Sequence, residues 1–291
     1  MTTPNFVDLE NKVAIITGAG RGVGRLISLA YAKQKMRLVL ASRTIGEIKK
    51  VSNEIQVAGG TSVFKQTDIS SINDVQGLIE MTMEEFGQID VLVNNAAVVG
   101  PIGLLENNDI NHWINTININ LIGTFSLIHQ VLPIMKEAGG GKIINLAGGG
   151  GLDSRPRFSA YASSKAAIIR LTETIAEEAI SSHVYVNAIT PGTIYTDATK
   201  EIENAGKDAG ETAAGEIHLL KQGGGTDPRK IKELAIFLAS HSSDRITGKI
   251  LSAAYDDWQS VNDSMMNLPK DMYNLRRVDR FTFDKVSKVF C

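Results

Sequence analysis

Hydrophobic residues recur along the first 190 residues in two alternating patterns. Short runs rich in β-branched residues are typical of strands that are buried on both faces of a parallel sheet. Longer stretches between them carry apolar residues every three or four positions, which is typical of amphipathic helices. The expected strands are Val13–Thr17, Leu38–Ala41, Val63–Phe64, Val91–Val93, Ile143–Leu146 and Val184–Ile189, and the expected helices are Leu26–Lys35, Ile45–Val57, Val75–Phe86, Ile110–Met135 and Ala160–Ile180.

This alternation predicts the α/β class, as a single-domain Rossmann-type doubly wound parallel sheet flanked by helices. A helix at Pro228–Ser240 and a strand at Lys249–Ser252 are expected to add one more unit to the sheet. The catalytic domain would then span residues 1–257, and the polar, locally basic residues 258–291 would form a C-terminal extension.

The segment between residues 196 and 226 interrupts the alternation. It is rich in glycine, alanine and charged residues, which predicts a mobile loop or short helices. Because long connections in compact domains are usually functional, we expect residues 197–225 to act as a substrate loop, often a lid. The alternative is a disordered surface insertion.

Composition narrows the class of protein. The formal net charge is −2, so the overall charge favours neither nucleic acid nor an anionic membrane as a partner. Cys291 is the only cysteine, which excludes an internal disulfide and fits a reducing compartment. The N-terminus lacks the features of a signal peptide, and no continuous apolar run has the length of a membrane span. The five histidines show no metal-ligand spacing. We therefore expect a cytoplasmic protein without a metal.

A glycine-rich turn follows the first expected strand and opens the first expected helix. Glycines at its ends allow a tight turn, the approach of a pyrophosphate to the backbone, and close packing of helix on sheet. A strand before the turn and a helix after it are the context that dinucleotide binding requires. The predicted phosphate-binding residues are Gly18, Gly20, Arg21, Gly22, Val23 and Gly24.

With this turn the chain begins to resemble the classical short-chain dehydrogenase/reductase family. The resemblance continues, in family order and near family spacing over residues 10–255, through Asp68, Asn94-Asn95-Ala96-Ala97, Asn120, Tyr161-x-x-x-Lys165 and Pro191-Gly192. It implies a nicotinamide cofactor. The residues that it adds to the cofactor site are Asp68, Ile69, Asn95, Ala96, Ala97, Tyr161, Lys165, Pro191, Gly192, Ile194 and Thr196.

The end of the second strand bears on which nicotinamide cofactor is bound. An acidic residue there would bind the ribose hydroxyls of NAD, but this chain has Ser42-Arg43. The planar guanidinium of Arg43 suits a 2′-phosphate, and Arg21 in the glycine turn can face the same group. We therefore expect NADP(H), with NAD(H) as the less favoured cofactor.

Tyr161 and Lys165 lie four residues apart, on one face of an expected helix. A nearby ammonium and an oxidised nicotinamide would lower the phenol pKa from its usual value of about 10. The family resemblance makes Tyr161 the proton donor to a carbonyl and Lys165 a partner of the nicotinamide ribose. It makes Asn120 the residue that positions a relay water, because Asn120 and not Asn118 has the family register before Gly123.

One family feature is missing. The family has a serine about thirteen residues before the tyrosine, where this chain has Ala147 and Gly148. Loss of one such donor costs roughly a hundred- to a thousandfold in rate. Backbone N–H groups of the glycine run 148–151 could replace it, or Ser154 or Ser159 could, or the activity could be largely lost.

Three functions are compatible with these residues. The first is an NADP(H)-dependent oxidoreductase that moves hydride between nicotinamide and a carbonyl or secondary alcohol. The second is a dinucleotide-binding sensor or scaffold without redox chemistry, and the third is a redox-recycling enzyme acting on an activated sugar. A homodimer or homotetramer is implied by resemblance, and Ile114, Ile117, Leu121 and Phe125 are compatible with such an interface.

Overall fold

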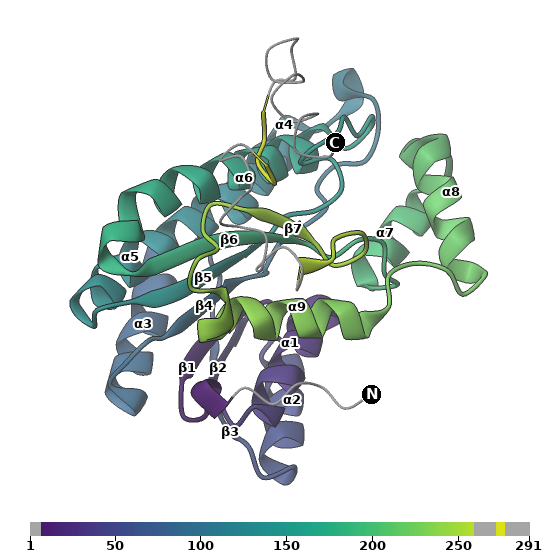
Figure 1. Cartoon of the computed structure of the whole chain (residues 1–291). Coiled ribbons are helices and arrows are strands. Elements are labelled where there is room, and N and C mark those ends of the chain that lie inside the picture. Colours follow the sequence, from purple (N-terminus) through teal and green to yellow (C-terminus); the bar gives the residue numbers. More distant parts are fainter. Residues whose placement is uncertain (1–6, 259–271, 277–291) are drawn as a thin grey trace.

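Seven parallel strands form one sheet at the centre of the molecule (Figure 1). The computed structural model describes residues 7–258 and 272–276. The spatial order of the strands is β3-β2-β1-β4-β5-β6-β7. Their bounds are β1 Val13–Thr17, β2 Arg37–Ser42, β3 Thr61–Gln66, β4 Val91–Asn94, β5 Gly141–Leu146, β6 Val184–Thr190 and β7 Ile250–Ser252. The predicted Rossmann-type doubly wound sheet is confirmed.

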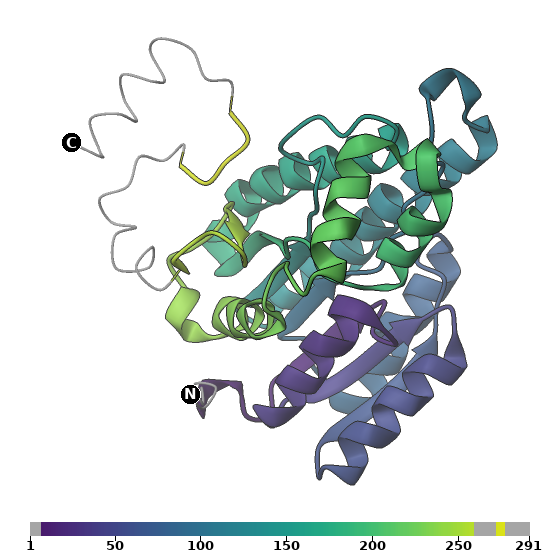
Figure 2. The ribbon, with the colours of Figure 1, turned by 90° about the vertical axis from the view of Figure 1, so that its right-hand side faces the viewer.

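Helices cover both faces of the sheet, as Figures 1 and 2 show. Buried side chains of α1, α2 and α9 belong to one hydrophobic core, and those of α3, α5 and α6 belong to a second core on the opposite face. The helices of the two layers are α1 Gly22–Lys33, α2 Ile45–Val57, α3 Ile72–Phe86, α4 Ile110–Ile117, α5 Thr124–Glu137, α6 Ser159–Ala179 and α9 Pro228–Ala239. The chain adds β2 and β3 on one side of β1 and then returns to add β4 on the other side. Because the order of strands reverses between β1 and β4, a crevice opens at the carboxyl ends of these two strands.

The segment between β6 and α9 is helical. It contains α7 (Asp197–Ala205), a single 3-10 turn η5 (Gly206–Ala209) and α8 (Gly210–Lys221). The side chain of Thr196 accepts a hydrogen bond from the backbone N–H of Thr199 and begins α7 with a capping box. Of the two predicted forms of this segment, short helices are therefore the correct one. Figure 1 shows α7 and α8 beyond the edge of the sheet.

The long helix predicted at Ile110–Met135 is continuous but changes its winding. Between α4 and α5 the six residues Asn118–Gly123, labelled η3, form a π-helical segment. Gly123 lies against Ile69, and a Cβ on it would come within 2.8 Å of that side chain. Such segments are rare and often occur at functional sites.

The helical stretch Ile110–Glu137 has the length and mean hydropathy of a membrane span, although 44% of its apolar window is buried inside the fold. Its Asn120 hydrogen-bonds to Ser164 of α6, and its Leu127 and Val131 belong to the core under the sheet. The stretch therefore packs as a core helix of this fold.

Part of the predicted C-terminal extension lies along the edge strand β7. The backbone N–H of Ile250 donates to the carbonyl of Tyr273 (2.8 Å), and the N–H of Leu275 donates to Glu173 of α6 (2.6 Å). Residues 272–276 thus cover the edge that β7 would otherwise expose. Trp258, the first residue of the predicted extension, is buried against Phe237, and residues 259–271 and 277–291, with Cys291, lie outside the described residues.

Candidate active site

A cavity of about 880 Å³ opens at the carboxyl ends of the strands and runs from the glycine turn to Tyr161. Apart from Gly24, every residue predicted to bind the cofactor lines it. Motifs that lie up to 178 residues apart in the sequence therefore meet in one place because all of them follow parallel strands. The cavity also receives side chains from α7 and α8.

The glycine turn has the conformation that a phosphate site requires. Gly18 and Gly22 have φ values of +62° and +53°, a region that side chains disfavour. Gly24 lies beneath the turn, where an added Cβ would come within 2.2 Å of the Gly18 carbonyl oxygen. No side chain caps the start of α1, so its first N–H groups remain available to an anion.

The side chain of Asn95, after β4, fixes the first part of this turn. Its Nδ2 donates to the carbonyls of Thr17 (2.9 Å) and Gly18 (3.1 Å). The hydroxyl of Thr17 in turn accepts from the backbone N–H groups of Asn95 and Ala96. The glycine turn and the segment after β4, both predicted from the sequence, are therefore hydrogen-bonded to each other, and both line the same cavity.

The two arginines expected to select the cofactor differ in their partners. Arg21 lies between two carboxylates, with its guanidinium 3.5 Å from Glu47 and 3.6 Å from Asp197. Arg43 is exposed and lines the cavity together with Ser42 and Asp68. A cluster of glycine-turn N–H groups and two guanidinium groups thus lies at the outer end of the cavity, which fits the phosphates of a dinucleotide.

Tyr161 and Lys165 lie on α6 at the inner end of the cavity. The ammonium of Lys165 donates to the carbonyl of Leu146 (2.7 Å) and lies 5.7 Å from the centre of the Tyr161 ring. Burial lowers the pKa of Lys165 to about 8. Burial also raises the pKa of Tyr161, while Arg155 lowers it and Glu216 raises it. In the protein without a cofactor, the expected lowering of the Tyr161 pKa is therefore not found, because burial outweighs the nearby positive charge.

Asn120 lies outside the cavity lining, within the π-helical segment. It is 1% exposed, and its side chain bonds to the backbone N–H and carbonyl of Val98 and to the hydroxyl of Ser164. These contacts tie the helix to the segment after β4. Asn120 therefore does not line the cavity itself but bonds to Val98, which does, and its role in positioning a water stays a prediction.

The position of the missing serine is identified by geometry. A Cβ on Gly148 would lie 2.5 Å from the phenol oxygen of Tyr161, whereas Ala147 packs in a small core with Ile169 and Ile250. Ser159 accepts a hydrogen bond from the indole of Trp113, and neither Ser159 nor Ser154 lines the cavity. These two serines are therefore not placed to replace the missing hydroxyl.

Several further cavity residues were not named individually from the sequence, although three of them lie within the predicted substrate loop 197–225. They come from the β5–α6 loop, from α7 and α8 and from the segment after β7: Leu152, Asp153, Arg155, Phe158, Glu201, Ile202, Glu216 and Tyr255. Arg155 and Glu216 form an ion pair with a 2.6 Å contact across 61 positions of sequence. A pairing between two connections of irregular sequence has no periodicity or motif that could reveal it.

Comparison with known proteins agrees with this geometry. The model of the family described as short chain dehydrogenase matches residues 12–207. The chain is 30% identical over 243 residues to 3-oxoacyl-(acyl-carrier-protein) reductase FabG of Thermotoga maritima, which covers 84% of this chain and 96% of that protein.

Two solved structures are similar over most of their length. An actinorhodin polyketide ketoreductase with NADPH is 25% identical with a TM-score of 0.77, covering 83% of this chain and 95% of that one. An NAD⁺-bound xylitol dehydrogenase is 27% identical with a TM-score of 0.77, covering 84% and 98%. With the sheet order, the glycine turn and the Tyr161–Lys165 pair at one cavity, these matches show that the chain belongs to the short-chain dehydrogenase family of nicotinamide-dependent oxidoreductases.

Proposed function

We propose that this protein is an NADP(H)-dependent oxidoreductase that interconverts a carbonyl compound and a secondary alcohol. The observation that carries the proposal is the position of the Tyr161 phenol. It lies against the glycine run after β5, beside Lys165, at the inner end of a cavity whose outer end has the features of a phosphate site.

In the proposed reaction the nicotinamide supplies or accepts the hydride. In reduction, the phenol of Tyr161 donates a proton to the substrate oxygen while the carbonyl carbon gains the hydride, and oxidation reverses both transfers. The raised pKa of Tyr161 keeps the phenol protonated at neutral pH, which suits reduction. Lys165 places a positive charge beside the ring and would hold the nicotinamide ribose.

The preference for NADP(H) rests on charge at the outer end of the cavity. Arg43 is exposed there, and Arg21 lies in the glycine turn. A 2′-phosphate would compete with Glu47 and Asp197 for Arg21, so it must outweigh two weak surface ion pairs. The bidentate geometry of guanidinium and phosphate favours that exchange.

The site is proposed to serve a small-molecule substrate in a cytoplasmic protein that forms a homodimer or homotetramer. Residues 1–257 would be the catalytic domain. The helices α7 and α8, within residues 197–225, would enclose the substrate, because Glu201, Ile202 and Glu216 line the cavity.

The test is turnover of NADPH and NADH with a panel of ketones, diketones and keto-sugars, using wild type, Tyr161→Phe and a matched Tyr195→Phe control. Tyr195 is half exposed, and its hydroxyl contacts Glu203 outside the cavity lining. We expect Tyr161→Phe to lose about a hundred- to ten-thousandfold in turnover with NADPH affinity preserved, and Tyr195→Phe to stay near wild type. Turnover retained in Tyr161→Phe would refute the mechanism.

The glycine at position 148 favours a second candidate, a nucleotide-binding sensor without redox chemistry. Tight NADPH binding with no turnover across the panel would support it. Gly148→Ser is a poor way to restore activity, because the added Cβ would meet the Tyr161 oxygen at 2.5 Å.

A further inference from the structure

The glycine run after β5 brings two functional side chains against neighbouring backbone positions. A Cβ on Gly148 would lie 2.5 Å from the Tyr161 phenol oxygen, and a Cβ on Gly149 would lie 2.6 Å from Nη1 of Arg155. Any larger residue at either position would displace the phenol or the guanidinium. The run that lacks the family serine therefore also leaves room for Arg155 in the cavity that Tyr161 lines.

Arg155 is held in a fixed orientation at this place. Its Nη1 and Nη2 donate to the two carboxylate oxygens of Glu216 at 3.2 Å and 2.6 Å, and its guanidinium lies 4.8 Å from the centre of the Phe158 ring. The Arg155 side chain is 16% exposed, and both members of the pair line the cavity. A guanidinium has five N–H donors, and Glu216 accepts two of them, so three have no acceptor among the described residues.

Reduction of a carbonyl develops negative charge on the substrate oxygen, and the family serine is absent. A partly buried guanidinium is a charged donor that stabilises such an oxygen more strongly than a neutral hydroxyl does. We propose that Arg155 replaces the missing serine by donating a hydrogen bond to the substrate oxygen, and that Glu216 is its positioning residue. Arg155 transfers no proton: hydride still comes from the cofactor and the proton from Tyr161. This inference rests on the proposed function.

The electrostatics of the pocket agree with this arrangement. The charged groups that face Tyr161 are Lys165 on its own helix, Arg155 in the β5–α6 loop and Glu216 on α8, and Asp153 and Glu201 line the same cavity. Arg155 lowers the pKa of the Tyr161 phenol, and Glu216 raises it. Removing the charge of Arg155 should therefore raise the pKa of the Tyr161 phenol, and removing the charge of Glu216 should lower it.

The experiment compares Arg155→Ala, Arg155→Lys and Glu216→Gln with the matched control Arg157→Ala. Arg157 is in the same loop and contacts the carbonyl of Asp208; it is only partly exposed and does not line the cavity. With the best carbonyl of the panel, Arg155→Ala should lose about a hundred- to a thousandfold in kcat at unchanged NADPH affinity. Arg155→Lys should fall between it and wild type, and Arg157→Ala should stay within about threefold of wild type.

Two further readouts separate a donor from a merely structural residue. Added guanidinium chloride, well below denaturing concentrations, should partly restore Arg155→Ala and leave Arg157→Ala unaffected. Ultraviolet titration, with Tyr161→Phe subtracted, should show the phenol ionising at higher pH in Arg155→Ala and at lower pH in Glu216→Gln. Near-normal kcat in Arg155→Ala with an unshifted phenol titration would overturn the proposal.

Failure of the proposed function would look different. If wild type reduced no carbonyl, the reductase assignment would fail, and the phenol titration would still decide whether Arg155 and Tyr161 face each other. A shift in both variants would support the placement of the pair, and no shift would refute it.

Discussion

Gly24 shows how much the conformation of the proposed cofactor site depends on the absence of a single Cβ. An alanine there would place its Cβ 2.2 Å from the Gly18 carbonyl oxygen, which belongs to the glycine turn, and 2.5 Å from Asn95 Nδ2, which holds that turn in place. Backbone cannot move aside as a flexible side chain does, so the turn itself would have to shift.

We predict that Gly24→Ala weakens NADPH binding more than tenfold and lowers the free energy of unfolding by about 1–3 kcal/mol. Gly46→Ala is the matched control, because no atom lies within 4 Å of the added Cβ and the residue is in the first turn of α2. It should bind NADPH normally and keep or slightly raise stability. Fluorescence titration and urea unfolding measure both effects, and equal NADPH affinity in the two variants would contradict the prediction.

Lys165 is a residue of the cavity whose charge should change with pH not far above neutrality. Its pKa is lowered to about 8 by burial, so the ammonium is largely present at pH 7 and is lost as the pH rises through 8. We therefore predict that kcat/KM for NADPH, which reports the free enzyme, falls up to tenfold per pH unit above about 8. In Lys165→Arg, which keeps its charge, this alkaline fall should disappear. A flat wild-type profile to pH 9.5 would show that the lysine charge is not required.

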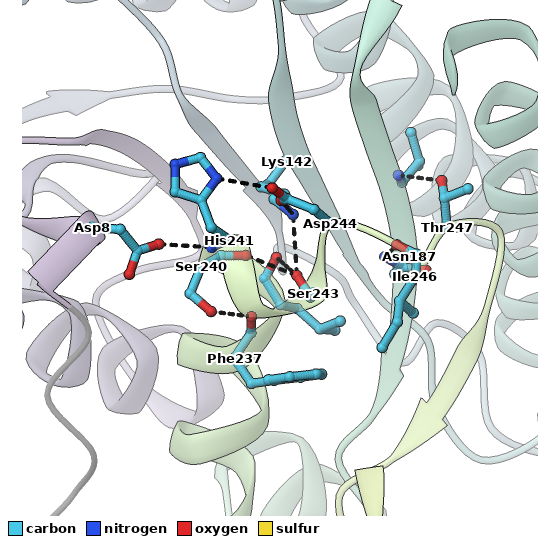
Figure 3. A network of polar contacts seen from close by, with 12 residues as sticks. Asp8, Lys142, Asn187, Phe237, Ser240, His241, Ser243, Asp244, Ile246 and Thr247 are labelled. Atoms are coloured by element: carbon cyan, nitrogen blue, oxygen red, sulfur yellow. Dashed lines mark hydrogen bonds and ion pairs between the residues drawn. The ribbon is translucent and has the colours of Figure 1, made fainter. Parts of the chain in front are cut away.

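At the scale of elements, the amino-terminal end of β5 is tied to the end of α9 by a polar network, shown in Figure 3. Lys142 donates to Asp244 (2.6 Å) and to Ser243 (3.1 Å), and His241 contacts the other oxygen of Asp244 (3.0 Å). Asp8 accepts from the backbone N–H of His241 (2.7 Å) and joins the first turn of the chain to the same network. The side chain of Lys142 is 9% exposed, so Asp244 compensates a nearly buried charge.

Asp244→Asn should lower the free energy of unfolding by about 1–3 kcal/mol at pH 7, since Lys142 would lose its charged acceptor. Burial alone would raise the pKa of Asp244, but the hydrogen bonds and charges of Lys142 and, to a smaller extent, His241 together outweigh burial and lower it. A lowered folded-state pKa contributes stability that is present above the unfolded value and is lost as the pH falls through the folded value. The difference from wild type should therefore be constant between pH 5 and 8 and shrink only below about pH 4.

Urea unfolding over this pH range measures the difference. Glu80→Gln is the control, because Glu80 is exposed and accepts only from Gln76 one turn away on α3 (2.7 Å). It should change stability by less than about 0.5 kcal/mol. An Asp244→Asn variant as stable as this control would mean that the network contributes little.

At the scale of the whole molecule, the outer side of the α4–α5 helix presents large apolar side chains. Ile114 and Phe125 are 48% and 46% exposed, whereas Ile117 and Leu121 of the predicted set are only partly exposed. Ile110 and Ile122 are also exposed on this helix. An apolar row on one helix is typical of an interaction surface, and we expect it to pair two copies of the chain.

Ile114→Glu combined with Phe125→Glu should therefore lower the mass of the oligomer in sedimentation velocity, because two charges would be buried in the interface. Val57→Glu is the control: Val57 is 90% exposed at the end of α2, away from this row. An unchanged mass in the double variant, or a wild type that is already monomeric, would assign the row to another role.

The sequence determined the sheet, the order of its elements and both ends of the cavity. Runs such as Val13–Thr17 and Val184–Thr190 form buried strands wherever a parallel sheet is possible, and each motif follows a strand. Apart from Gly24, the predicted residues of the glycine turn consequently line one cavity with the Tyr161–Lys165 pair, since parallel strands bring their carboxyl ends together.

Only the tertiary structure decided the surroundings of Tyr161. Burial raises the pKa of Tyr161, and the side chain of Asn120 bonds to Val98 and Ser164 and does not line the cavity. The Arg155–Glu216 pair joins a loop to a helix 61 residues later in the sequence. It lies beside the glycine run, which in the sequence indicated only the loss of the family serine. Local patterns are set by neighbours three or four positions apart, whereas burial, charge and contact depend on distant segments that meet only when the chain has folded.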